Sequence, residues 1–195
     1  RPIKWVAERT ESFLTDTHGR DHVTHAELAV SNDGKFLGFK NETIANLGAY
    51  ARVFGTVTPT YLFGPCATGV YTIPAAYSNV KAVYTNTAPV DAYRGAGRPE
   101  ATYTIERLVE KAAMELGIDR TEIRMKNFPK EFPFKQTLVH TVDSGDYVAG
   151  LEKAKQMADY SGFDARRKKS EANGKLRGIG VSSYFEACGI APSAA

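Results

Sequence analysis

The sequence predicts an α+β fold, in which helices pack on a mixed sheet that contains a β-hairpin. Residues 24–30 and 36–45 have strand character and are joined by Ser31-Asn32-Asp33-Gly34, a turn sequence typical of hairpins. From Ala101 onward, apolar residues recur at helical spacing as far as Gly117, and glycine is the residue that most often ends a helix. Strands and a long helix are therefore expected in one chain.

Further elements are expected on both sides of this helix. Residues 80–86 are rich in Val, Ala, Tyr and Thr and predict a strand. Asp119-Arg120-Thr121-Glu122 has the pattern of a capping box and predicts a second, short helix. Ser144-Gly145-Asp146 precedes a third helix that is expected to reach about Ala158. This third helix is expected to turn Val148, Leu151, Ala154, Met157 and Ala158 toward the core.

The last part of the chain is expected to return to the sheet. The polar residues 164–175 predict a surface connection, and Arg166-Arg167-Lys168-Lys169 within it reads as a solvated run. Residues 176–185 then read as a strand. The whole chain, 1–195, is interpreted as one internal segment of a larger subunit, with a subdivision near Phe132.

Composition limits the class of protein. The chain has 195 residues, of which 43% are hydrophobic and 24% charged, as in ordinary globular proteins. A net charge of +3 gives little electrostatic attraction to nucleic acid. No apolar run approaches the roughly 20 residues of a membrane span. Because Cys66 and Cys188 are the two cysteines, no disulfide framework is expected, and we expect a reducing, cytoplasmic location.

The most informative stretch is Ala92-Tyr93-Arg94-Gly95-Ala96-Gly97-Arg98-Pro99-Glu100, just before the long helix. Two glycines flanking Ala96 permit a tight turn and close approach of another group to the backbone. The helix that follows offers free N–H groups and the positive end of its dipole, which suits an anion or an oxo group. This is not a dinucleotide-binding motif, because Glu100 stands where a third glycine would be needed.

The residues around this turn carry a resemblance to a known family. The sequence from Thr85 to Glu100 resembles the active-site loop of the molybdenum hydroxylases, which include xanthine dehydrogenase and aldehyde oxidase. Residues 4–11, 122–128 and 178–186 resemble other parts of the same large subunit, in the same order. The similarity is greatest to the carbon monoxide dehydrogenase-like branch. It implies a segment of about a quarter of a molybdopterin-binding large subunit.

The resemblance also implies cofactors and partners. The parent enzyme would hold a molybdopterin-type molybdenum cofactor and hydroxylate an aldehyde or a heterocycle, with carbon monoxide as the weaker alternative. Electrons would leave through [2Fe–2S] clusters on an iron–sulfur small subunit to FAD on a medium subunit. The substrate would be a small molecule, without nucleic acid and without a membrane span. The segment by itself is expected to be inactive.

The resemblance assigns the cofactor-binding residues to the glycine turn. Arg94 matches the arginine whose backbone N–H approaches an oxygen ligand of molybdenum, and Tyr93, Gly95 and Ala96 would shape the pocket around it. Such a backbone donor needs no reorganisation during turnover. No side chain of the segment is expected to bind the metal directly, and no catalytic residue is expected within it, because the family's catalytic glutamate lies later in the large subunit.

Two departures from the family pattern bear on the substrate. Copper-containing carbon monoxide dehydrogenases carry a cysteine where this chain has Gly95, so copper binding is not expected. Animal-type xanthine enzymes place an aromatic residue where this chain has Ala96, so purine specificity is not expected either. Tyr184 or Phe185 is the candidate to replace part of that aromatic wall. Glu186 completes the candidate substrate pocket but does not match the catalytic glutamate.

Other conspicuous residues are interpreted as structural. His18, His22 and His25 could suggest a metal site, but strand geometry would put His22 and His25 on opposite faces. Cys66, with no His or Cys near it in sequence, reads as a small, partly buried residue and not as a nucleophile. Three further residues lie in expected helices and are interpreted as packing residues and not as substrate contacts: Tyr103, Met114 and Met157.

A different class of function stays open. The chain could be a folding or interaction domain that binds no cofactor, with the glycine turn as a plain strand-to-helix connection. Measurement of molybdenum separates the two hypotheses.

Overall fold

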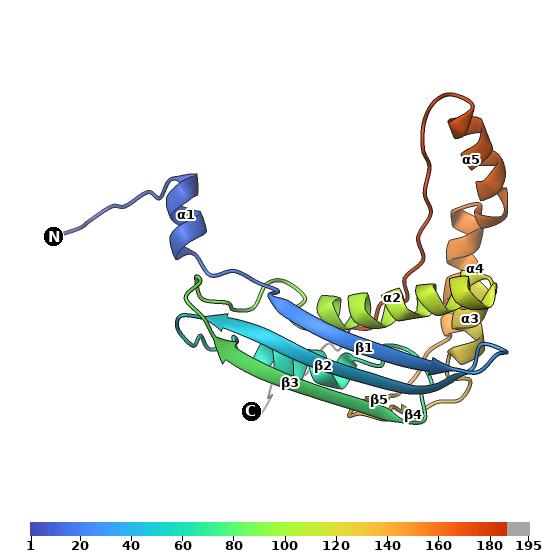
Figure 1. Cartoon of the computed structure of the whole chain (residues 1–195), viewed down its shortest axis with the longest axis horizontal. Helices are drawn as coiled ribbons and strands as arrows, with labels where there is room; N and C mark the ends of the chain where they lie inside the picture. The colour runs from blue at the N-terminus through green and yellow to red at the C-terminus, as the bar shows by residue number, and fades with distance from the viewer. Residues whose placement is uncertain (187–195) are drawn as a thin grey trace.

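The computed structural model describes residues 1–186 and contains a mixed three-stranded sheet (Figure 1). Strands β1 (His22–Val30) and β2 (Phe36–Gly48) form an antiparallel hairpin, and β3 (Ala76–Tyr84) runs parallel to β2 on its other side. The order in the sheet is β1-β2-β3. The expected hairpin and the α+β class are therefore confirmed.

The strands are longer than expected, or displaced. In the hairpin, pairing continues to His22 opposite Ala45, so β1 begins before the expected start. The third strand was expected at 80–86, but it begins at Ala76, opposite Phe39. Pairing with a neighbour, which a single strand's composition does not reveal, sets these ends.

A long helix crosses one face of the sheet and completes the core. Helix α2 (Arg98–Leu116) lies against the hairpin (Figure 1), and a left-handed Gly117 ends it, as expected. Helix α3 (Arg120–Asn127) follows, and the Asp119 carboxylate caps it by accepting hydrogen bonds from two backbone N–H groups. Apolar side chains that are fully buried in the core include Phe36, Tyr71, Ile73, Ile105, Val109 and Ile123.

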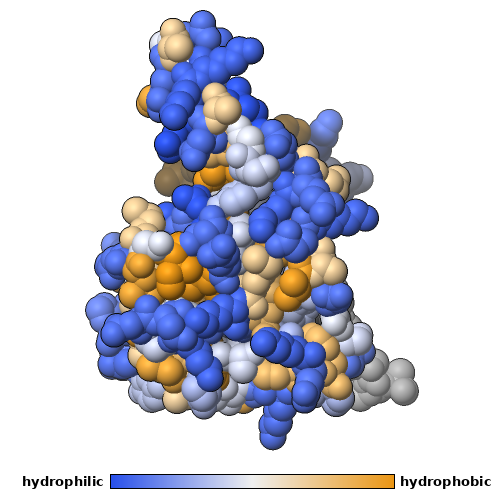
Figure 2. All heavy atoms as spheres, turned by 90° about the vertical axis from the view of Figure 1, so that its right-hand side faces the viewer, coloured by the Kyte–Doolittle hydropathy of each residue, from blue (hydrophilic) through white to orange (hydrophobic). Residues whose placement is uncertain are grey.

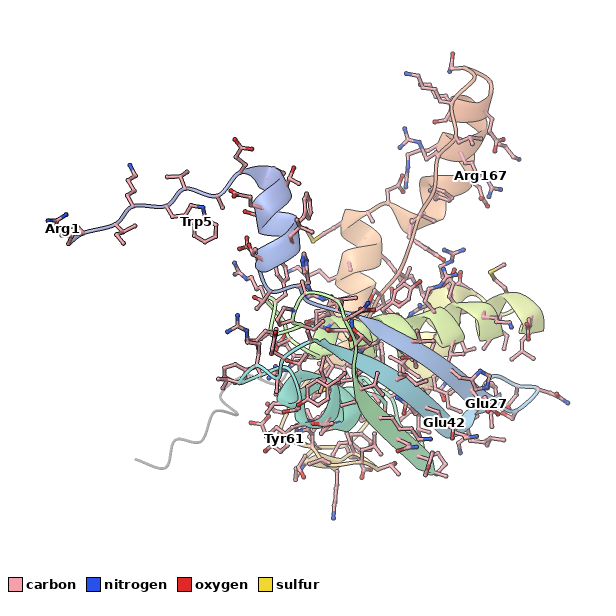
Figure 3. The ribbon with its side chains drawn as sticks, turned by 60° about the vertical axis from the view of Figure 1, so that its left-hand side comes forward. Arg1, Trp5, Glu27, Glu42, Tyr61 and Arg167 are labelled. Carbon is pink, nitrogen blue, oxygen red and sulfur yellow. The ribbon has the colours of Figure 1, made fainter. Side chains whose placement is uncertain are left out.

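Short elements fill the connection between β2 and β3. A π-helical turn, η1 (Thr58–Phe63), and a 3₁₀ turn, η2 (Gly64–Cys66), lie against both α2 and β3. A two-stranded ladder of β4 (Phe134–Lys135) and β5 (Thr141–Val142) follows α3. Helix α1 (Arg9–Thr15) and the preceding residues project from the body, and Trp5 on this N-terminal arm is exposed (Figure 3).

A second projection contradicts one expectation. Helix α4 (Tyr147–Met157), the short turn η3 (Tyr160–Gly162) and helix α5 (Phe163–Glu171) rise from the body as an arm (Figure 1). The surface connection expected at 164–175 is therefore mostly helix. Ion pairs from Arg167 to Asp164 and to Glu171 at helical spacing stabilise α5. The end of the arm is largely hydrophilic (Figure 2), which agrees with a solvated basic run.

The inward-facing residues expected for α4 are mostly exposed. Leu151 packs against the core, but Val148, Ala154, Met157 and Ala158 are exposed, because the arm extends beyond the sheet. The prediction that Tyr103 and Met114 on α2 are packing residues is also wrong, since the two residues are 69% and 74% exposed. Apolar periodicity marks a helix face, but the position of that face in the molecule decides its burial.

The strand expected at 176–185 is absent: within the described residues this segment has no strand partner. It descends from α5 past α2 as extended chain (Figure 1). Arginine side chains bind its carbonyl groups: Arg120 donates to Ile179 O at 2.9 Å, and Arg124 donates to Val181 O at 3.0 Å. No helix among residues 1–186 is long and apolar enough to cross a membrane.

Candidate functional site: the glycine turn at the start of helix α2

The turn before α2 has an unusual backbone. Gly95, Ala96 and Gly97 are three consecutive residues with positive φ angles, of 94°, 23° and 87°. The turn is closed by hydrogen bonds from Ala96 N to Tyr93 O at 2.8 Å and from Arg98 N to Gly95 O at 3.2 Å. L-residues rarely adopt such angles, so this conformation needs glycine at two of the three positions.

Close packing adds a second reason for both glycines. A Cβ on Gly95 would lie 2.6 Å from Pro99 Cγ. A Cβ on Gly97 would lie 2.6 Å from backbone atoms of Leu62 and Phe63 in η1. The turn is thus held between the first residues of α2 and the π-helical turn, and a larger side chain would displace it.

The turn presents unused backbone donors. Within the described residues, the N–H groups of Arg94, Gly95 and Gly97 make no hydrogen bond. They lie directly before α2, a helix of 19 residues whose dipole favours negative charge at this end. Donors without a protein acceptor beside a helix N-terminus fit an oxygen-bearing, electron-rich group.

Arg20 is a member of this site that sequence reasoning missed. Its guanidinium donates a hydrogen bond to Arg94 O at 2.5 Å and lies 4.9 Å from the centre of the Tyr93 ring. It also faces the Glu100 carboxylate, with 3.7 Å between Arg20 Nε and Glu100 Oε2. No local pattern could indicate this contact, because the two arginines are 74 residues apart.

The structure brings the expected substrate-pocket residues to the same helix end. Glu186 forms an ion pair with Arg98, with 3.3 Å between Oε1 and Nε, and Tyr184 donates a hydrogen bond to Glu186 at 2.8 Å. Burial and this hydrogen bond raise the pKa of Tyr184 to about 12. Phe185 packs against a small buried cluster of Phe63, Cys66 and Ala101.

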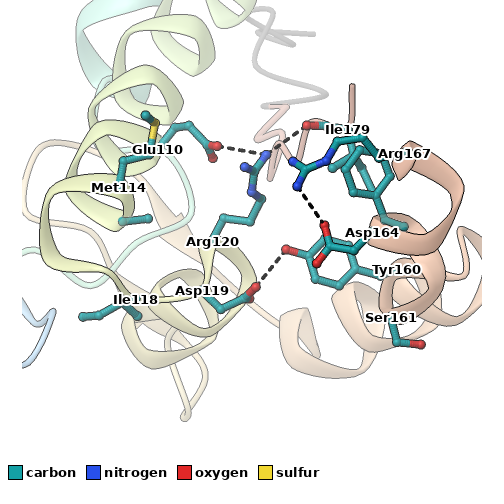
Figure 4. Close-up of a pocket in the computed structure, with 12 residues that line it drawn as sticks. Glu110, Met114, Ile118, Asp119, Arg120, Tyr160, Ser161, Asp164, Arg167 and Ile179 are labelled. Atoms are coloured by element: carbon teal, nitrogen blue, oxygen red, sulfur yellow. Dashed lines mark hydrogen bonds and ion pairs between the residues drawn. The ribbon is translucent and has the colours of Figure 1, made fainter. Parts of the chain in front are cut away.

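A buried charge network holds the segment that carries these three residues. Arg124 is fully buried and donates to Glu106 at 2.9 Å, while Arg120 pairs with Glu110 at 3.0 Å. The same two arginines bind the carbonyls of residues 181 and 179, and Figure 4 shows the contact of Arg120 with Ile179. Tyr71 donates to Glu106 from the opposite side, and burial raises the pKa of Tyr71 well above its ordinary value.

Cys66 has a histidine near it in space, although none is near it in sequence. His140 does lie near it, with 3.5 Å between Cys66 Sγ and His140 Nε2, and the thiol packs beside Ala101 in the first turns of α2. Burial nevertheless raises the thiol pKa to about 11, so the expectation that Cys66 is no nucleophile agrees with its surroundings. The other cysteine, Cys188, lies outside the described residues.

The histidines are arranged as strand geometry predicts. His22 faces inward and is half-buried, whereas His25 faces solvent beside Glu27. Burial lowers the pKa of His22, which favours the neutral ring. Residues 1–186 contain no group of three or more His, Cys, Asp or Glu side chains placed to hold a metal ion.

Several hollows lie beside α2, and two of them bear on the site. A groove of about 770 Å³ runs between β1 and α2 and reaches Pro99 and Glu100, the residues that follow the glycine turn. Its other lining residues include Arg20, His22, Thr24, Tyr103 and Arg107. A smaller pocket of about 380 Å³ lies between the far end of α2 and the arm (Figure 4). Arg120 pairs there with Glu110 and Arg167 with Asp164, while Asp119 accepts a hydrogen bond from Tyr160.

A mixed sheet, a long helix across it and a donor-rich turn at the start of that helix describe the class of domain, and comparison with known proteins identifies its family. The profile of the molybdopterin cofactor-binding domain family matches residues 1–128. The chain belongs to this family.

Individual relatives agree with this assignment. The chain is 40% identical, over 99% of its length, to the carbon monoxide dehydrogenase large chain of Hydrogenophaga pseudoflava, and covers 25% of it. It is 34% identical, over 97% of its length, to the 6-hydroxypseudooxynicotine dehydrogenase complex subunit gamma of Paenarthrobacter nicotinovorans, again covering 25%. The solved quinoline 2-oxidoreductase of Pseudomonas putida 86 superposes with a TM-score of 0.81 at 32% identity, over 87% of this chain and 22% of that one. The chain therefore spans about a quarter of the curated relatives' length.

Proposed function

We propose that the chain supplies one wall of the molybdenum site in the large subunit of an oxidative hydroxylase. The observation that carries this proposal is the glycine turn, with its unused N–H groups of Arg94, Gly95 and Gly97 at the N-terminus of α2. Its donors match the chemistry of a molybdenum cofactor, whose oxygen ligands accept hydrogen bonds.

Each residue of the turn has a separate role in this proposal. The Arg94 N–H donates toward an oxygen ligand of the cofactor, and Gly95 keeps the approach to it open. Tyr93 and Ala96 shape the adjoining pocket. When bound, the cofactor supplies the two-electron oxidation that converts a C–H group and water into a hydroxyl group. The protein contributes donors that are fixed before the reaction and therefore cost no reorganisation.

The proposed substrate is an aldehyde or a nitrogen heterocycle. Ala96 leaves room for a ring, and Tyr184 and Phe185 lie on the segment that reaches the start of α2, where they can provide an aromatic wall. The related quinoline enzyme is itself named for a heterocycle. Carbon monoxide is the weaker candidate, because the position of the copper-binding cysteine is Gly95 here and the Cys66 thiol stays protonated.

The proposal includes partners for electron transfer. Electrons leave through [2Fe–2S] clusters on a small subunit to FAD on a medium subunit, as the family resemblance implies, and the assembly is placed in the cytoplasm. The catalytic base lies outside this chain. Glu186 does not take that role, since it is paired with Arg98 and accepts a hydrogen bond from Tyr184.

Metal analysis tests the proposal. We expect near-stoichiometric molybdenum in the longer parent protein and only background molybdenum on the 195-residue chain alone, because one wall leaves the cofactor's polar groups unpaired. Aldehyde or heterocycle oxidation should follow the metal. If the parent also lacks molybdenum, the alternative of a cofactor-free folding or interaction domain holds.

A further inference from the structure

We propose that Arg20 and Glu100 are positioning residues that hold the glycine turn in its donor-presenting conformation. The inference rests on the proposed function for its purpose, but its geometry stands on contacts within this chain. Arg20 touches the turn at both its backbone and its aromatic side chain, and Glu100 faces Arg20 from the first turn of α2.

Arg20 contacts the turn at the Arg94 carbonyl and at the Tyr93 ring. Its terminal nitrogen donates to Arg94 O at 2.5 Å, which orients the peptide group between Arg94 and Gly95. The N–H of that same peptide belongs to Gly95, so the carbonyl contact sets where this donor points. The guanidinium also lies over the Tyr93 ring, 4.9 Å from its centre, and the same nitrogen would be 3.5 Å from a Cβ on Gly95. A planar guanidinium can make such contacts together, whereas an ammonium group cannot.

Glu100 explains why Arg20 stays in this place. The Glu100 side chain is only 9% exposed, and both carboxylate oxygens are buried without a hydrogen bond among the described residues. A buried carboxylate is costly unless a positive charge lies close to it. Arg20 Nε at 3.7 Å is that charge, supported by the N-terminus of α2. Glu100 thus attracts the guanidinium toward the turn.

The backbone around Arg20 is shaped for this contact. Arg20 has a φ of 61°, a left-handed conformation that L-residues rarely adopt. Gly19 lies so close to the turn that a Cβ there would be 2.5 Å from Tyr93 Cβ. His18 pairs with the chain leading into the turn, donating to Pro89 O at 2.9 Å and accepting from Asp91 N at 2.8 Å. A strained residue held by neighbours on both sides is typical of functional sites.

We call the contacts of Arg20 and Glu100 with the glycine turn the clamp. Hydrogen exchange in this chain tests the clamp without any cofactor. The amides of Ala96 and Arg98 are protected by the hydrogen bonds that close the turn. In Arg20→Ala, we expect these two amides to exchange at least about tenfold faster, because a charge-assisted hydrogen bond to the turn is lost. Arg20→Lys should recover only part of the protection, and Glu100→Gln should have a smaller effect in the same direction.

The matched control is Arg107→Ala, which removes an exposed arginine from the same groove. We expect it to leave Ala96 and Arg98 exchange within about twofold of the unchanged chain. Circular dichroism and exchange in the core around Ile105 confirm that each variant is folded. If folded Arg20→Ala behaves like Arg107→Ala, the clamp is wrong.

A second measurement separates this inference from the proposed function. In the molybdenum-loaded parent, Arg20→Lys should alter the Mo(V) electron paramagnetic resonance spectrum at unchanged metal content, since the donors around the metal move. Faster exchange in a parent that never binds molybdenum would leave the clamp standing and overturn the proposed function. An unchanged spectrum together with unchanged exchange would overturn the clamp alone.

Discussion

Arg98 and Glu186 form an ion pair, 3.3 Å between Nε and Oε1, that joins the start of α2 to the last described residues of the chain. The Arg98 side chain is 10% exposed and also donates to Ala96 O at 3.0 Å, so one guanidinium contacts both the glycine turn and the returning segment. The turn and the aromatic residues that precede Glu186 are thereby held at one site, although α2, α3, the β4–β5 ladder and the arm separate them in sequence.

Gly95→Val in the parent enzyme should lower turnover by at least about tenfold with the fold retained. The valine Cβ would clash with Pro99, and a φ of 94° is unfavourable for a β-branched residue. Steady-state kinetics with molybdenum content measures this effect. Gly178→Val is the matched control, because a Cβ there meets nothing within 4 Å. Normal turnover with normal metal content would contradict the placement of Gly95 beside the cofactor.

Arg124→Met should destabilise the chain by about 3–5 kcal/mol, because it leaves the buried Glu106 carboxylate without its cation. It also removes the donor to Val181 O, so the C-terminal segment should become more sensitive to proteolysis. Urea unfolding gives the free-energy difference. Arg107→Met, at an exposed position on α2, should change stability by less than about 0.5 kcal/mol. Equal stabilities of the two variants would refute a structural role for the network.

The Asp119 cap should make stability depend on acid pH. Burial raises the pKa of Asp119, but hydrogen bonds from Thr121, Tyr160 and Glu122 outweigh this effect, so the pKa of Asp119 lies below its ordinary value. A lowered pKa in the folded state means that the stabilisation is complete above the unfolded value and is lost as the pH falls through the folded value. Asp119→Ala should therefore cost about 1 kcal/mol at pH 7 and progressively less below about pH 4.

Unfolding of both proteins across this range measures the Asp119 effect. Asp119→Asn is the control, since its amide oxygen caps the helix at every pH. If the loss of stability caused by Asp119→Ala became larger as the pH falls, the predicted direction of the pH dependence would be wrong.

The parent enzyme should contain no stoichiometric copper. A copper site needs a soft thiolate, but Gly95 offers none, and burial keeps the Cys66 thiol protonated with a pKa of about 11. Elemental analysis of copper per molybdenum, with an assay of carbon monoxide oxidation, checks this expectation. We would reject this interpretation of the turn if copper stayed near one per molybdenum in Cys66→Ser and Cys188→Ser and the enzyme oxidised carbon monoxide.

The sequence by itself determined the elements whose signals are local. The hairpin at Ser31-Asn32-Asp33-Gly34, the helix that ends at Gly117 and the Asp119 cap all depend on turn and capping residues within a few positions. The sequence also predicts the glycine turn, because Gly95 and Gly97 precede a helix and lie within a motif that resembles the family's active-site loop. The subdivision near Phe132 and the roles of the turn residues stay predictions.

Only the tertiary structure decided which distant groups complete the site. Arg20 contacts Arg94, and Cys66 contacts His140, each across 74 positions of sequence. Neither contact could be predicted, because no local sequence pattern relates residues so far apart. Residues 176–185 look like a strand, yet the carbonyls of Ile179 and Val181 are bound by arginine side chains in place of a neighbouring strand. Composition records a preference for extended backbone, whereas the partner that satisfies its polar groups is settled only by packing.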